Sequence, residues 1–207
     1  MEKFLAFDSS GEELMVGCFN GEKYFELRKV GGGTELLLPL IDKVLKKAKM
    51  QINDVEVVCV GVGPGSWTGS RVAVVTAYGM ASANNNLKFA KFNSFDLISY
   101  NGSEKEVVKL VKAYANFVYA DDSKGEILAL TKDELRNIYR GKKFVSATDV
   151  IEEVSVVETN LKEVAFSLTE NGIYQDVSDI EPMYLRLSQA EYQRKERMEK
   201  ADGKQGA

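Results

Sequence analysis

The sequence predicts an α/β fold made of two rounds of strands and helices, the second round reduced. Three apolar strand segments fill the first thirty residues, and helical and strand segments then alternate to about residue 100. Within this stretch a β-branched run ends at a cluster of glycines, and a helical segment rich in Ala and Val follows. A second set of three strand segments begins near residue 106. Such alternation is typical of α/β folds with parallel strands.

Composition limits the classes of protein to consider. The chain has 207 residues, 44% of them apolar, which is enough for one large domain or two small ones. Its net charge of −4 argues against a protein that alone neutralises many phosphates of a nucleic acid. The N-terminus lacks the apolar core of a signal peptide, and no apolar run reaches the roughly 18 residues of a membrane span. We therefore expect a cytoplasmic protein with no membrane partner.

Cysteine and histidine usage restricts the chemistry further. Cys18 and Cys59 both lie in strand-like apolar runs, so we interpret each as a small buried hydrophobic residue. The chain contains no histidine, which excludes Ser-His-Asp and Cys-His nucleophile systems and histidine metal sites. We expect no metal, and any catalysis would depend on carboxylates, lysines or backbone dipoles.

The first thirty residues predict a three-stranded meander. Its strands are expected at residues 4–8, 14–19 and 24–30, with Asn20-Gly21 as a type I′ turn between the second and third. The first strand ends at Asp8, followed by Ser9, Ser10 and Gly11. An Asp here either caps a turn or belongs to a vestigial phosphate loop, because the segment resembles the first phosphate loop of the actin, hexokinase and Hsp70 ATPases.

A helix is predicted from Thr34, which would cap it, to about Lys49. Its apolar positions cover an arc of roughly 200°, about twice what a helix against a single core needs. The excess predicts a second contact, with a neighbouring helix or a partner protein. Pro39, just past the first turn, is expected to remove a backbone hydrogen bond or to kink the helix. The apolar positions are Leu36, Leu37, Leu38, Leu40, Ile41, Val44, Leu45 and Ala48.

A strand at residues 55–62 leads into a glycine turn. The turn contains Gly63, Pro64, Gly65, Ser66 and Gly69, and either Ser66 or Thr68 would cap the following helix. A turn of this kind is an anion site in some α/β folds, and in others its glycines serve packing alone. It matches neither the dinucleotide fingerprint, nor the P-loop, nor the nucleophile elbow.

The helix after the glycine turn is apolar around most of its circumference up to Ala83. Gly69, Ala73, Ala77 and Ala81 recur every four residues and form a smooth stripe that another backbone can approach closely. We predict burial on nearly all sides, with the chain covering both faces itself or a partner protein covering one.

A strand at residues 87–92 and a helix from Ser94 to Tyr100 complete the first round. The order of three strands, then helix, strand, helix, strand and helix is that of a ribonuclease-H-like domain. Asn101-Gly102-Ser103 is interpreted as a domain junction. We therefore expect an N-terminal domain at residues 1–102, a reduced domain at 103–187, and a charged helix and tail at 188–207.

The second round predicts strands at 106–111, 115–120, 126–131 and 144–147, without a second glycine turn. A helix at 161–171 would be capped by Thr159 or Asn160 and stopped by Gly172. Ser188 and Glu191 form a capping box for the terminal charged helix.

Four segments taken together resemble one family. FLAFDSS, TELLLPLIDKVL, VGVGPGSWTGSRVAV and EPMYLR, in this order, are similar to the TsaB (YeaZ) family of tRNA threonylcarbamoyladenosine biosynthesis, paralogous to TsaD. The resemblance implies two ribonuclease-H-like domains of the actin and Hsp70 (ASKHA) class, the second reduced. It also implies a non-catalytic subunit that uses no cofactor of its own, forms a heterodimer with TsaD, works with the ATPase TsaE and meets tRNA only indirectly. The absence of histidine separates the chain from TsaD, whose family binds metal through a histidine pair.

The same resemblance implies that two helices of the first domain pack against those of TsaD. Gly33-Thr34 replaces the His-Ser pair frequent in the family, and Trp67 replaces its usual Phe. The partner interface carried over to this chain consists of Leu36, Leu37, Leu40, Ile41, Val44, Trp67, Arg71, Val75, Tyr78 and Met80.

Two alternatives remain open from the sequence. One is an enzyme, either a nucleotide-binding ATPase-like protein that uses Asp8 and the glycine turn, or a peptidase of the same superfamily. The other is a self-associating module, in which the apolar helices of two copies pair when the partner is absent.

Overall fold

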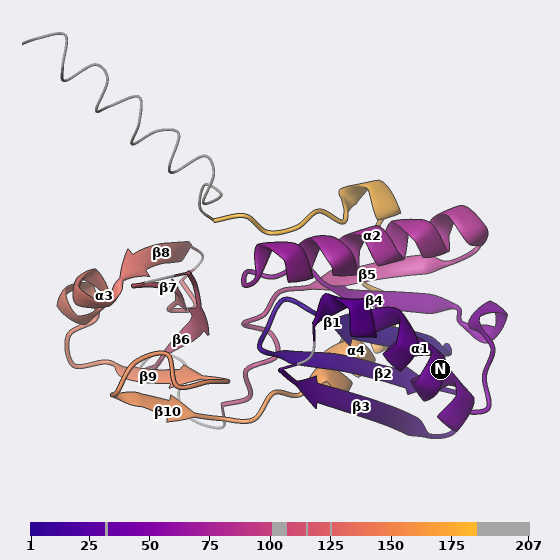
Figure 1. The fold of residues 1–207 in the computed structure, drawn as a ribbon, viewed down its shortest axis with the longest axis horizontal. Coiled ribbons are helices and arrows are strands. Elements are labelled where there is room, and N and C mark those ends of the chain that lie inside the picture. Colours follow the sequence, from indigo (N-terminus) through magenta and orange to yellow (C-terminus); the bar gives the residue numbers. More distant parts are fainter. Residues whose placement is uncertain (32, 101–106, 115, 125, 186–207) are drawn as a thin grey trace, which may run out of the picture.

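The computed structural model describes residues 1–31, 33–100, 107–114, 116–124 and 126–185. They form two five-stranded sheets. Figure 1 shows the sheets side by side, with the longer helices gathered around the first.

The first sheet has the strand order β3-β2-β1-β4-β5. β1, β2 and β3 form the predicted antiparallel meander, and β4 and β5 continue from β1 in parallel. All residues of β1 and β4 are buried, because helices cover both faces of the sheet, so these strands are continuously apolar rather than alternating. The strands are β1 Phe4–Asp8, β2 Glu13–Phe19, β3 Tyr24–Val30, β4 Val57–Gly61 and β5 Lys88–Phe92.

The second sheet repeats this topology in the order β10-β9-β6-β7-β8. β6, β7 and β8 form an antiparallel meander, and β9 and β10 are added in parallel. No helix connects β9 to β10, whereas a long helix connects β4 to β5, which is the sense in which this round is reduced. The strands are β6 Val107–Lys112, β7 Phe117–Asp121, β8 Ile127–Thr131, β9 Lys143–Ser146 and β10 Val154–Val156.

Two helices pack on one face of the first sheet and a third packs on the other. α1 (Leu37–Lys47) and α2 (Trp67–Ala83) share a core with alternate residues of β1 and β4. α4 (Leu161–Glu170) covers the opposite face, where Phe166 meets Phe4 edge-on at 5.0 Å. α4 therefore lies with the first sheet although it follows the second sheet in sequence. α3 (Lys132–Ile138) belongs to the second sheet.

The start of α1 differs from the prediction. Thr34 does not cap it, because Thr34–Leu36 form a separate 3₁₀ turn and Leu36 precedes α1 without a side-chain cap. Pro39 thus lies within the first turn of α1, where backbone N–H groups have no intrahelical acceptor, so it removes no helical hydrogen bond.

The hairpin between β2 and β3 also differs. A type I′ turn needs positive φ at both central residues, but here only Gly21 has it. Asn20 is instead the residue before the turn, and its side-chain oxygen accepts the backbone N–H groups of Glu22 and Lys23.

Residues 94–97 form turns rather than the predicted helix to Tyr100. The Asn93 side chain accepts the N–H groups of Phe95 and Asp96, which closes a single turn. Phe95 then enters a core beside the second sheet while Leu97 enters that of the first, and one helical face cannot serve both.

α2 is not buried on nearly all sides as predicted. Gly69, Ala73 and Ala77 of the predicted stripe are buried, and Ser66 is the N-cap, accepting the N–H of Gly69. The opposite face is open to solvent, and Val75 keeps 67% of its surface exposed. The chain thus covers only one side of this apolar helix.

Residues 173–185, which we call the C-terminal strap, return along the first sheet and beside α2 (Figure 1). The N–H of Gln175 donates to the carbonyl of Phe89 in β5 at 2.9 Å, and the N–H of Met183 donates to the carbonyl of Val62 at 2.8 Å. Ile180 is fully buried in the core shared by α1 and α2. A short 3₁₀ turn at Val177–Asp179 lies within the strap.

Several predictions fall outside the described residues. They are the junction at 101–103, the domain boundary within it, the first residues of the strands at 106–111 and 115–120, and the charged helix and tail at 188–207. Among the helices that the structure describes, none has the length and apolarity to span a membrane.

Candidate functional site

The glycine turn packs directly against the loop after β1. The N–H of Ser66 donates to the carbonyl of Ser10 at 2.7 Å, and the Ser9 hydroxyl donates to the carbonyl of Gly69. A Cβ at Gly69 would lie 1.8 Å from the Ser9 carbonyl oxygen, and one at Gly65 would lie 2.3 Å from that of Ser10. Close approach of two backbones therefore accounts for both glycines.

Asp8 lies beneath this contact, at the end of β1. It is 2% exposed, and its carboxylate accepts the backbone N–H of Ser10 at 3.0 Å. Burial raises the pKa of the Asp8 carboxyl above its ordinary value, and the hydrogen bonds from Ser10 and Ser9 only partly offset this. Asp8 thus caps the turn that carries Ser10, as one of the two readings of the sequence expected.

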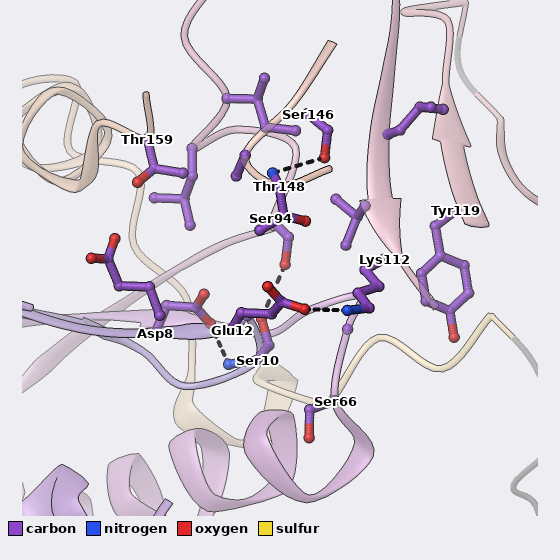
Figure 2. A pocket seen from close by; sticks show the side chains of 18 of the residues that line it. Asp8, Ser10, Glu12, Ser66, Ser94, Lys112, Tyr119, Ser146, Thr148 and Thr159 are labelled. Atoms are coloured by element: carbon purple, nitrogen blue, oxygen red, sulfur yellow. Dashed lines mark hydrogen bonds and ion pairs between the residues drawn. The ribbon is translucent and has the colours of Figure 1, made fainter. Parts of the chain in front are cut away.

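A cleft of about 1360 Å³ separates the two sheets, and Asp8 and Ser10 line it (Figure 2). Its apolar lining comes from both sheets, including Met15 of β2 and Leu110 of β6. Lys112 on β6 forms an ion pair with Glu12 across the cleft.

The charges of the cleft are mostly paired. Its two cationic lining residues are Lys112, which pairs with Glu12, and Arg28, which lies 3.0 Å from Glu13 and also donates to Thr159. A phosphate entering the cleft would meet no unpaired cation among the described lining residues and would lie near the Asp8 carboxyl. Among the described residues no group of three or more Cys, Asp and Glu is placed to hold a metal ion.

The exposed sides of α1 and α2 form a second candidate site. Apolar side chains project into solvent there, with Leu38 62%, Val75 67% and Tyr78 37% exposed. Gly79 lies on the same face of α2, and a Cβ built on it would meet no atom within 4 Å. We call Leu38 together with Arg71, Val75, Tyr78 and Gly79 the open helix face.

The structure divides the predicted interface residues into two groups. Leu37, Ile41 and Val44 are buried in the chain's own core and present no surface to a partner. Their buried state is a correction to the sequence-based set, which did not distinguish the sheet side of α1 from its outer side. Leu38, absent from that set, is exposed. The remaining residues, which keep accessible surface, are Leu36, Leu40, Trp67, Arg71, Val75, Tyr78 and Met80.

An aromatic and cationic cluster lies at the N-terminal end of α2. Trp67 stacks on Tyr184 of the C-terminal strap, with ring centroids 4.1 Å apart and planes 9° apart. The Nε of Arg71 donates to the Tyr184 hydroxyl at 2.7 Å, and its guanidinium lies 5.1 Å from the centroid of Trp67. Local sequence carries no signal for this contact, because Tyr184 comes from a distant segment.

Comparison with known proteins identifies relatives over most of the chain. Residues 34–182 match the family described as "TsaD: tRNA N6-adenosine threonylcarbamoyltransferase". The chain is 29% identical over 83 residues to the tRNA threonylcarbamoyladenosine biosynthesis protein TsaB of Buchnera aphidicola. It is 37% identical over 79 residues to the protein of the same name from Haemophilus influenzae. These alignments cover 39% and 37% of the chain, and only 38% and 34% of the two relatives.

A longer alignment joins the chain to an uncharacterised protein of Mycoplasma pneumoniae, the MG208 homolog. The two are 29% identical over 157 residues, which is 74% of this chain and 76% of the relative. This comparison extends the similarity well beyond the segments matched in the two TsaB proteins.

Solved structures give the fold. Two structures from Pseudomonas aeruginosa, one of YeaZ and one of an uncharacterised protein similar to peptidase YEAZ, each superpose with a TM-score of 0.72 at 18% identity. They cover 89% and 90% of this chain and the whole of the compared chains. With the TsaD-type family match, they confirm the α/β fold of the actin and Hsp70 (ASKHA) class, with its two ribonuclease-H-like units. The chain therefore belongs to the TsaD family, in its TsaB (YeaZ) branch.

Proposed function

We propose that this chain is a non-catalytic accessory subunit of tRNA threonylcarbamoyladenosine biosynthesis, which acts by forming a heterodimer with a TsaD-type enzyme. The names of its TsaB relatives supply the pathway. The observation that carries the heterodimer is the open helix face, where an apolar helix is covered by its own chain on one side only. The proposal places the chain in the cytoplasm, with the tRNA and the ATPase TsaE.

The composition of the open helix face favours a protein partner. Val75 and Tyr78 are exposed apolar groups one helical turn apart, and Leu38 adds a third from α1. Exposed apolar side chains that gather on one face of a helix are candidates for a protein interface. Gly79 lies in the middle of a helix, where Gly is about 1 kcal/mol less favourable than Ala, and the chain itself makes no use of the space above it. Close approach of a partner helix would use that space.

Several features favour an accessory role over the ATPase alternative. The glycine turn is occupied by the Ser9-Ser10 loop, and the cationic groups of the cleft are already paired. The peptidase mechanisms that use a histidine base, Ser-His-Asp and Cys-His, are not available to this chain, which has no histidine. We therefore propose that ATP is used by the partner proteins and that this chain needs no cofactor or metal.

Mutations on the open helix face test the heterodimer. We expect Val75→Glu and Gly79→Leu each to abolish copurification with the TsaD-type protein of the same organism, because one buries a charge and the other fills the space for a partner helix. Val156→Glu is the matched control, since Val156 on β10 is 59% exposed and lies on the second sheet. Retained binding in both α2 variants, with thermal midpoints unchanged, would show that the face is not the interface.

Reconstitution tests the accessory role itself. TsaD-type enzyme, TsaE and the threonylcarbamoyl-adenylate synthase are combined with ATP, threonine, bicarbonate and tRNA, with and without this chain, and modified adenosine is measured. We expect modification to require the chain, and the chain alone to hydrolyse neither ATP nor protein. Equal modification without it would refute the role.

Self-association through the same face is tested alongside. Two copies would bury the same apolar side chains against each other, so sedimentation of the chain alone at increasing concentration should show a dimer that Val75→Glu abolishes. Addition of the TsaD-type protein should convert that dimer into the heterodimer.

A further inference from the structure

Arg71 is held in one orientation by aromatic groups. Its Nε donates to the Tyr184 hydroxyl at 2.7 Å, and its guanidinium lies 5.1 Å and 5.5 Å from the ring centroids of Trp67 and Tyr184. Trp67 and Tyr184 are themselves stacked, so each ring limits the rotation of the other. An Arg fixed in this way loses little side-chain freedom when it binds a further group.

The two Nη groups of the Arg71 guanidinium remain available as hydrogen-bond donors. A guanidinium has five N–H groups, and only the Nε–H is used here. Among the described residues the Nη groups have no hydrogen-bond or ion-pair partner, and the side chain is exposed on the open helix face. The two Nη groups therefore present a parallel pair of donors to whatever covers this face.

The surroundings indicate which group would bind. Arg71 is the only charged residue in the 17 residues of α2. The neighbouring strap contains Asp176, Asp179 and Glu181 and no Lys or Arg. A nucleic acid presents many phosphates, and among the described residues of α2 and the strap it would meet one cation and three carboxylates. The stack between Trp67 and Tyr184 already covers one face of each ring, which leaves less ring surface for a nucleobase. A single carboxylate of a protein fits both the charge and the fork of donors.

We propose that Arg71 is the charged anchor of the open helix face, positioned by Tyr184, and that it binds an Asp or Glu side chain of the TsaD-type partner through its two Nη groups. The inference rests on the proposed heterodimer and names its recognition chemistry. Trp, Tyr and Arg are enriched among the interface residues that contribute most of the binding energy. The apolar neighbours Val75 and Tyr78 would exclude water from the pair.

Calorimetric titration of the full chain with the TsaD-type protein tests the anchor. We expect Arg71→Met to weaken binding roughly 30-fold, and Arg71→Lys, which keeps the charge but loses the fork, by about 10-fold. Tyr184→Phe, which keeps the ring but removes the hydroxyl, should weaken binding by about 3-fold. Arg140→Met is the matched control on an exposed Arg near α3 and should change affinity less than about 2-fold. The salt dependence of affinity should flatten in Arg71→Met.

A double-mutant cycle identifies the partner group. Each Asp and Glu on the partner surface is changed to the amide, and one of them should lose its effect on affinity when Arg71 is already Met. Trp67 is the only tryptophan in the chain, so a 5-fluorotryptophan label gives one ¹⁹F resonance, which should shift when the partner binds.

The outcomes separate the two proposals. If Val75→Glu abolishes binding while Arg71→Met binds like wild type, the anchor is refuted and the heterodimer stands. If Arg71→Met weakens binding but no partner carboxylate couples to it, the assigned chemistry is wrong. Loss of tRNA binding rather than partner binding in Arg71→Met would replace the carboxylate by a phosphate. If wild type does not bind the partner at all, both proposals fail.

Discussion

Two glycines of α2 differ completely in what surrounds them. A Cβ on Gly69 would overlap the Ser9 carbonyl, whereas one on Gly79 would meet open space. The first glycine belongs to the internal contact between two loops, and the second to the open helix face.

We expect Gly69→Ala to destabilise the fold by about 3 kcal/mol, because backbone atoms of Ser9 would have to move. Gly79→Ala should instead stabilise it by up to about 1 kcal/mol, from helix propensity alone. Urea unfolding followed by circular dichroism measures both. Similar effects of the two substitutions would contradict the loop contact.

Asp8 makes stability depend on pH. Its pKa is raised by burial, so between the ordinary value of 3.8 and the raised value the folded state binds more protons than the unfolded state. Stability is therefore lost as pH rises through this window. An Asn at position 8 would still accept the Ser10 N–H and would carry no charge at any pH. We expect the stability gained by Asp8→Asn to grow within the window by about 1.4 kcal/mol per pH unit, measured by thermal melts from pH 4 to pH 8. A gain that does not change with pH would rule out titration of Asp8.

The strands of both meanders and two helix caps could be predicted from the sequence. β-branched runs bounded by Gly and Asn gave the strands of both meanders, and the caps at Ser66 and Asn160 depend only on nearby residues. α3 is not among the predicted helices, although Thr131 and Glu134 form a capping box, because the predicted strand at 126–131 already includes Thr131. Its signal was present in the sequence.

Other features of the fold differ from the prediction because they depend on contacts between distant segments, which local sequence does not reveal. The turn at 94–97 serves two cores at once, and the C-terminal strap joins β5 by a single bridge between Phe89 and Gln175. Leu37 and Leu38 are identical in type, yet one is buried and the other exposed, because only the placement of α1 on the sheet distinguishes them. The cleft and the Trp67–Tyr184 stack likewise depend on how distant segments meet.

The strap is a structural part of the first sheet rather than an appendage. Ile180 is fully buried, so Ile180→Ala should lower the free energy of unfolding by about 3 kcal/mol. Ile173 in the same strap is 50% exposed, and Ile173→Ala should change it by no more than about 0.5 kcal/mol. Chemical denaturation of both variants is the measurement. Equal, small effects would mean that the strap detaches without affecting the core.

At the scale of the whole molecule, polar contacts join the two sheets across the cleft. Glu12 follows β1 and Lys112 ends β6, so their ion pair connects the sheets directly. Both side chains are largely exposed, and such pairs contribute at most about 1 kcal/mol.

We expect Lys112→Met to leave thermal stability nearly unchanged but to broaden the distribution of distances between the two sheets. Spin labels on β3 and β8 with pulsed dipolar spectroscopy measure that distribution. High salt should broaden the wild-type distribution in the same way and have little further effect on the variant. Identical distributions in the two proteins would show that the pair does not hold the cleft closed.

Because α4 and the strap pack on the first sheet, this sheet can be completed only after the second sheet has been synthesised. When residue 100 leaves the ribosome, all five strands of the first sheet have been synthesised, but α4, which covers the face that carries Phe4 and Phe19, has not. The second sheet must emerge before α4 and Ile180 complete the first. The nascent first sheet therefore waits, with one apolar face open, for about eighty further residues, some four to sixteen seconds at usual elongation rates. During that interval we expect chaperones that bind exposed apolar surface to recognise it.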